Sequence, residues 1–144
     1  MREILFNAIY DKLVTVTNLK GSDGTIRIYK YPIAVPEGFP AVSITCSKLE
    51  SRILDNARDL RTYYFNVRII QEKMTEAFGP EKAERVARKR EDEILDVFDN
   101  DNDLSVSGVI RSTPVNVDWG YINSNTQIVL DITIAVEVAV NITA

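Results

Sequence analysis

The hydrophobic residues of the N-terminal segment recur at three- and four-residue spacing, with polar residues between them. This spacing places them on one side of a helix. The residues of this stripe are Ile4, Leu5, Ala8, Ile9, Leu13 and Val16. We therefore expect an amphipathic helix over residues 2–17. It should end within residues 18–21, before the turn cluster 21–24, because Asn and Gly tolerate the left-handed backbone that closes a helix.

Alternation of hydrophobic and polar residues, which is typical of strands, begins after this helix. It predicts a short strand and two longer half-buried strands, over residues 25–29, 41–46 and 62–71. The stretch 31–40 contains Pro32, Pro36 and Pro40 and should be an extended loop, because proline has no amide hydrogen for a sheet ladder.

The segment 47–61 between the two longer strands is rich in charged residues and fits two structures. One is a long projecting hairpin arm. The other is a short helix that buries Leu49, Ile53 and Leu60. A slack loop of this length is uncommon inside a compact domain, so we expect ordered structure of one kind or the other.

A second helix is predicted from Pro80 to about Phe98. Proline is accepted in a first helical turn, and Glu81 and Glu84 place negative charge near the positive end of the helix dipole. The expected buried face comprises Ala83, Val86, Ala87, Ile94, Val97 and Phe98. The acidic run 99–103 should stop the helix, because its short polar side chains compete for backbone hydrogen bonds.

The C-terminal part of the chain has the composition of a sheet. Strands are predicted over 109–118 and 128–142, joined as a hairpin through 119–121 and a turn at 123–125. Every second residue from Ile128 to Ile142 is aliphatic, so this face must be buried. Such a strand would reach ~50 Å, whereas a compact domain of this length has a radius of gyration near ~14 Å. We therefore expect the strand either to bend at a bulge or to have its end pair with, or pack upon, another copy of the chain.

These elements predict a single α+β domain over residues 1–144. A mixed, mostly antiparallel sheet of about four to five strands packs against the N-terminal helix and one long central helix, and the charged segment at about 47–61 projects.

Composition narrows the function classes. There are 17 Lys and Arg against 21 Asp and Glu, a formal charge of -4, the opposite of the basic surface expected for a protein that grips nucleic acid. Histidine is absent, which removes the commonest general base and the usual nucleophilic triads. One cysteine, Cys46, fits a reducing compartment. No segment reads as a secretion signal or a membrane span.

Several patterns suggest chemistry, and each has a simpler explanation. Asp99, Asp101 and Asp103 match the first positions of a calcium loop, but Leu104 and Ile110 replace the glycine and glutamate that the motif requires, so a solvated turn is expected. The acidic residues of the second helix belong to its solvated face, and they are Glu91, Asp92, Glu93 and Asp96.

Nucleophiles and nucleotide-binding patterns lack their partners. Ser43, Cys46, Ser47 and Ser51 have no histidine to activate them. The cluster 21–24 lacks the Lys and Ser/Thr of a phosphate loop. The aromatic residues 63–65 fit the core and rim of a strand better than a base-stacking platform. We expect no enzyme, no metal and no cofactor.

Taken in order, the elements are a helix, a Pro-rich entry into a strand at Pro40-Ala41-Val42-Ser43-Ile44, a charged arm, a second strand, a long helix and two closing strands ending in 128–142. This order resembles the tail terminator (tail completion) proteins of long-tailed bacteriophages. The resemblance covers nearly the whole chain.

The resemblance implies a structural virion protein that assembles with itself into a ring, usually a hexamer. Such a ring caps the tail tube protein, meets the head-tail connector protein, and lets DNA pass without specific binding. It would be found at the head-proximal end of the virion tail, after assembly in the host cytoplasm. The charge of -4 suits such a channel, because like charge with phosphate discourages sticking.

Two groups of residues are candidates for the contact between subunits. The first lies in the charged segment, and the second lies on the more polar face of the last strand. They are Arg52, Asp55, Asp59 and Arg61, with Glu137 and Ala139. Two alternatives stay open, namely a neck, head-completion or other minor tail protein, and a non-viral α+β binding module.

Overall fold

The computed structural model describes residues 1–21, 24–32, 38–71, 79–122 and 127–141. Its elements in chain order are α1 (Arg2–Leu13), the 3-10 helix η1 (Thr17–Leu19), β1 (Arg27–Tyr29), β2 (Ala41–Ile53), β3 (Arg58–Ile70), α2 (Pro80–Asn100), β4 (Val109–Ile122) and β5 (Gln127–Asn141). The predicted class is confirmed: the fold is α+β, with an N-terminal helix, one long central helix and a mixed, mostly antiparallel sheet.

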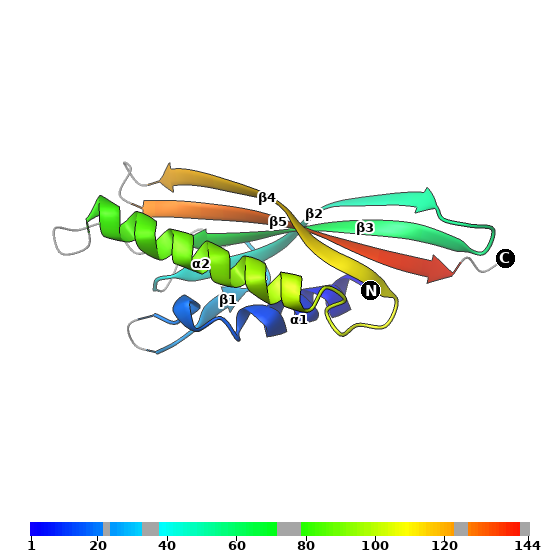
Figure 1. Ribbon diagram of the computed structural model, residues 1–144, viewed down its shortest axis with the longest axis horizontal. Helices are drawn as coiled ribbons and strands as arrows, with labels where there is room; N and C mark the ends of the chain where they lie inside the picture. The colour runs from blue at the N-terminus through cyan, green and yellow to red at the C-terminus, as the bar shows by residue number, and fades with distance from the viewer. Residues whose placement is uncertain (22–23, 33–37, 72–78, 123–126, 142–144) are drawn as a thin grey trace.

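The sheet has five strands in the order β1-β2-β3-β5-β4. Only β1 runs parallel to its neighbour, β2, and the other pairs are antiparallel. The long strands make the molecule elongated, and the ends of β2, β3 and β5 extend past both α1 and α2 (Figure 1).

The hydrophobic core lies between the sheet and the helices. The even-numbered residues of β5 from Ile128 to Val138 are buried, as the alternation predicts, and they share the core with α1 and α2. Val140 is half-buried, and Ile142 lies outside the described residues. We call this side the helix-bearing face. The odd-numbered residues of β5 define the opposite, helix-free face, which no described helix covers.

The pairing of β5 bears on the expectation that we drew from the length of this strand. Along one edge, β3 pairs with β5 from Arg58 opposite Asn141 to Ile70 opposite Val129, without a register shift. Along the other edge β4 pairs as far as Val138, and the Ala139 amide donates to the Gly108 carbonyl at 3.1 Å. The backbone of β5 is therefore paired on both sides within one chain as far as Ala139. The expected bulge in β5 is wrong, because β3 is almost as long and pairs with β5 without a shift in an elongated molecule (Figure 1). That the end of β5 pairs with, or packs upon, another copy stays a prediction.

The N-terminal helix is shorter than predicted. It ends at Leu13, and the Val16 amide then donates to the Leu13 carbonyl at 3.0 Å, a tighter i→i+3 bond. Residues 14–17 are all β-branched, and this lowers helix propensity enough for the chain to leave the α-helix and form η1. Ile4 of the predicted stripe is 52% exposed.

The strands are longer than predicted at their connections. Residues 119–121 belong to β4 and not to the link with β5, because the ladder between the two strands continues to Ile122 opposite Gln127. The Trp119 indole donates to Glu91 at 3.1 Å, and the Tyr121 hydroxyl donates to Glu84 at 3.0 Å. Both aromatic side chains are thereby tied to α2. The predicted turn at 123–125 lies outside the described residues, as do parts of the turn cluster 21–24 and the loop 31–40.

Helix α2 runs two residues further than Phe98, to Asn100, and its buried face differs from the predicted one. Ala83, Ala87, Ile94 and Phe98 are buried as expected, but Val86 and Val97 are only half-buried. Arg90, which the hydrophobic pattern gave no reason to place inside, is 4% exposed.

Candidate subunit interface

The charged segment 47–61 is a β-hairpin arm. It consists of the far ends of β2 and β3, paired from Lys48 opposite Tyr64 to Ile53 opposite Asp59, beyond a bulge at Ser47. The hairpin alternative is therefore correct, and the helical one is wrong. The arm extends past the helices at one end of the molecule (Figure 1).

The turn at the tip of the arm is braced by its own hydrogen bonds. The amides of Leu54 and Asp55 both donate to the Arg58 carbonyl, at 3.0 and 3.1 Å. The Asp55 carboxylate accepts the Ala57 amide at 2.9 Å and the Arg58 guanidinium at 2.9 and 2.8 Å. The hydrogen bonds from Arg58 and Ala57 hold the pKa of Asp55 below its usual range. Asp55 therefore stabilises the turn.

A polar cluster lies at the base of the arm on the helix-free face. Lys48 pairs with Glu50 at 2.6 Å, and the Tyr64 hydroxyl donates to the same carboxylate at 3.2 Å. The hydrogen bond from Lys48, followed by that from Tyr64, lowers the pKa of Glu50. The same pairing raises the pKa of Lys48. All of these groups face solvent, so the cluster contributes little to stability.

The structure distributes the sequence-predicted interface residues over two faces and a tip. Arg52 lies opposite Leu60, which in turn lies opposite Ala139, all on the helix-free face. Asp59 and Arg61 lie opposite Val140 and Val138, on the helix-bearing face.

Glu137 also lies on the helix-free face, and it accepts a hydrogen bond from Arg111 at 3.1 Å. The candidates therefore surround the arm and do not form one patch.

The tip of the arm carries exposed hydrophobic side chains that the sequence analysis did not assign to the interface. Ile53 is 80% exposed, Leu54 is 40% exposed, and Leu49 further back is 43% exposed. Leu49 and Ile53 lie on the helix-bearing face, opposite Tyr63 and Asp59, and the described helices leave both of them exposed. The sequence does contain a signal for them. The larger aliphatic residues of β2 stand at even positions as far as Ile44 and at odd positions from Leu49 onward. This change indicates a bulge and a hydrophobic face that continues into the arm.

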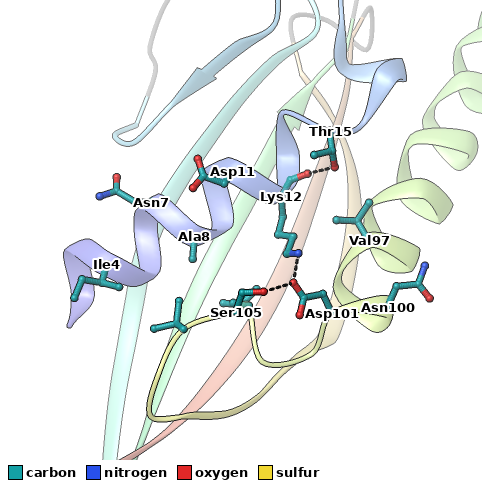
Figure 2. A pocket seen from close by; sticks show the side chains of 12 residues that line it. Ile4, Asn7, Ala8, Asp11, Lys12, Thr15, Val97, Asn100, Asp101 and Ser105 are labelled. Atoms are coloured by element: carbon teal, nitrogen blue, oxygen red, sulfur yellow. Dashed lines mark hydrogen bonds and ion pairs between the residues drawn. The ribbon is translucent and has the colours of Figure 1, made fainter.

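A groove of about 640 Å³ lies between α1, the end of α2 and the loop that follows it (Figure 2). Its hydrophobic lining consists of Ile4, Ala8, Val97, Leu104 and Val106. An ion pair crosses it, from Lys12 on α1 to Asp101. The Ser105 hydroxyl also donates to Asp101, at 3.1 Å. The hydrogen bond from Lys12 is the main reason why the pKa of Asp101 lies below its ordinary value.

The outer edge of β4 is obstructed along part of its length. The Ser112 amide points away from β5 and donates to the Asn102 carbonyl of the preceding loop. Two residues on, Pro114 has no amide hydrogen, and a register shift follows at Val115. These are devices that keep an edge strand from pairing with another strand. The outer edge of β2 is covered by β1 only over Ala41–Ser43.

The acidic run after α2 has the structure of a hydrogen-bonded turn. Asp101 pairs with Lys12, and the Asp103 carboxylate accepts the Ser105 amide at 2.9 Å. Within the described ranges, no cluster of three or more His, Cys, Asp or Glu side chains is arranged to hold a metal ion. In the same part of the chain, no helix combines the length and the hydrophobicity needed to cross a bilayer.

Comparison with known proteins gives a match at the level of the fold. A comparison with protein-family models finds no match, and neither does a comparison with curated proteins. Among solved structures, the chain is similar to a chain in the virion of a native gene transfer agent (GTA) particle, with a TM-score of 0.64 and 13% sequence identity. The similarity covers 94% of this chain and 95% of the other. At this identity it establishes a shared fold.

Proposed function

We propose that this chain is a structural virion protein, and specifically a tail terminator whose copies form a ring at the head-proximal end of a phage tail. The observation that carries the proposal is the match to a virion chain over almost the full length of both chains. A partial match could arise from a common supersecondary motif. A match over 94% of one chain and 95% of the other requires the same order of helices and strands.

The surfaces of the subunit support assembly rather than catalysis. The chain carries an arm that extends past its own helices and ends in exposed Ile53 and Leu54. Exposed hydrophobic residues at a braced hairpin tip are typical of a contact with another protein. The proposed partners are further copies of the same chain in a hexameric ring, the tail tube protein on one side and the head-tail connector protein on the other.

The position of the arm supports the proposed subunit interface, and the candidate residues have different roles in it. Arg52, Asp59 and Arg61 are on the arm and available to a neighbour, and Ala139 and Glu137 flank its base. Asp55 supports the interface by holding the turn. With a net charge of -4, the ring would let DNA pass without binding it, and DNA affinity should be negligible at physiological salt.

Electron microscopy of particles made with and without this protein tests the proposal. A tail terminator is needed to stop tube growth and to join tail to head, so its absence should give over-long tails and unjoined heads. Filled heads that leak DNA while tails keep their length would instead identify a neck protein. Normal particles would contradict any role in the virion and favour a non-viral binding module.

A further inference from the structure

We infer that the ring forms head to tail, with the arm tip of one copy, Ile53 and Leu54, seated in the groove between α1 and the 101–106 loop of the next copy. This inference deepens the proposed function and rests on it, since it identifies the surfaces that join the subunits. It commits to one occupant of the groove, a second copy of this chain.

The tip is built for insertion. Ile53 and Leu54 are exposed although the turn beside them is held by the Asp55 and Arg58 hydrogen bonds, so the tip has a fixed shape before it meets a partner. A preorganised tip loses little conformational entropy on binding. The arm from Ser47 to Ile53 extends roughly 20 Å at the usual rise per strand residue, enough to reach across a subunit boundary.

The groove matches the tip in chemistry. Its walls include the hydrophobic side chains of Ile4, which is 52% exposed, together with Ala8 and Val106. Aliphatic side chains that are uncovered on both surfaces of one chain would be covered together if the tip of a neighbour entered. Burial of such side chains is worth about 1.5–3 kcal/mol each when complete.

The charges near the tip and in the groove also favour this contact. Arg52 stands next to the tip and forms no ion pair within the described part of the chain, whereas Asp11 lines the groove with an exposed carboxylate. Asp101 on the loop side of the groove is already paired with Lys12, so Asp11 is the carboxylate that remains for a neighbour. Arg52 beside the tip and Asp11 in the groove are complementary between two copies.

The tip and the groove are different surfaces, so the contact is heterologous. A contact of this kind cannot be completed by two copies facing each other. Each copy leaves a free tip or a free groove until a ring closes. In Figure 1 the arm points away from α1, so the tip does not fill the groove of its own chain.

Disulfide trapping of the purified full chain tests the contact. In a Cys46→Ser background, Leu54→Cys and Ala8→Cys in the same chain should give, under mild oxidation, a ladder of covalent multimers that ends at the closed ring. Each single-cysteine variant should stop at or below a dimer. A double variant that also stops at a dimer would overturn the head-to-tail contact.

Oligomeric state measured by light scattering and sedimentation provides a second readout. Ile53→Asp should weaken association by about tenfold or more, as expected for a hydrophobic residue at the centre of an interface. Val115→Asp, on a β4 residue that is 53% exposed and belongs neither to the arm nor to the groove lining, is the matched control and should leave association unchanged. Arg52→Asp should weaken association, and Arg52→Asp combined with Asp11→Arg should restore it.

The two proposals fail in different ways. A ring that persists in Ile53→Asp and yields no ladder would overturn the tip-in-groove contact and leave the tail terminator proposal intact. A chain that stays monomeric at every concentration, alone and with tube subunits, would overturn both. Circular dichroism on each variant separates loss of association from loss of folding.

Discussion

The guanidinium of Arg90 donates a hydrogen bond to the side-chain oxygen of Gln71 inside the protein. Arg90 is 4% exposed, and Gln71 is fully buried. Arg90 also donates to the Asn18 carbonyl at 2.8 Å, and the Gln71 amide group donates to the Ala83 carbonyl at 3.0 Å. This network ties α2 to the end of β3 and to η1. It explains why a charged residue occupies the buried face of a helix.

Replacing Arg90 with methionine should destabilise the fold strongly. Methionine keeps the apolar stem of the side chain but leaves Gln71 and the Asn18 carbonyl without this donor inside the protein. Buried polar groups without partners are costly, so we expect a loss of about 3 kcal/mol in the free energy of unfolding, measured by urea denaturation. Arg88→Met, at an exposed position of the same helix, should change it by less than about 0.5 kcal/mol.

The ion pair between Lys12 and Asp101 should make the free energy of unfolding depend on pH in the acidic range. The pKa of Asp101 in the folded protein lies below its ordinary value of 3.8, so the unfolded chain takes up a proton first as the pH falls. The stabilisation is therefore complete above the ordinary value, and it is lost as the pH falls through the lower, folded value.

Urea unfolding across this acidic range checks the expectation. Asp101→Asn should flatten the fall in unfolding free energy below the ordinary pKa. In a Lys12→Met background the same replacement should flatten it much less, because the main cause of the lowered pKa has been removed. An identical slope in the wild type and Asp101→Asn would show that the pair does not contribute.

Gly108 should resist replacement by alanine. Its φ is +92°, a conformation that residues with a side chain rarely adopt, although an added Cβ would meet no atom closer than 3.8 Å. The cost is therefore backbone strain, and we expect a loss of about 1–2 kcal/mol in thermal or urea unfolding. Gly120→Ala, where nothing lies within 4 Å and φ is not positive, is the control and should be nearly neutral.

The ion pair between Arg68 and Asp131 on the helix-free face should contribute little. Its geometry is bidentate, at 2.8 and 3.0 Å, but the Arg68 side chain is 51% exposed and solvent screens the charges. A double-mutant cycle with Arg68→Gln and Asp131→Asn should give a coupling energy below about 1 kcal/mol. A coupling energy above this value would mean that the pair is effectively desolvated.

The fold was predictable because its strongest patterns are local. The alternation in β5 from Ile128 to Val138 describes a buried face correctly. The spacing in α2 gives only part of its buried face, because Val86 and Val97 are half-buried and Arg90 is buried. The extension of β4 through Trp119 and Tyr121 was not predictable from the local pattern, because these residues are held by pairing with β5 and by side-chain hydrogen bonds to α2.

The candidate interface was only partly predictable, for a different physical reason. Charged residues such as Arg52 and Arg61 identify the segment that leaves the core, but their side chains point to opposite faces of the arm once the strands pair. The sequence pattern gives Leu49 and Ile53 a role only as the buried residues of a short helix over 47–61. The bulge at Ser47 changes the face on which β2 presents its aliphatic residues, and no propensity scale places it there.

The interruption of β4 at Pro114 has a consequence for how copies can accumulate. A strand of another molecule placed along the outer edge of β4 would lack a hydrogen bond at Pro114 and lose its register at the bulge that follows. Sheets of successive molecules therefore cannot be joined without limit through this edge. Growth of the fibrous kind is thereby hindered on that side, so copies of the chain have to associate through other surfaces.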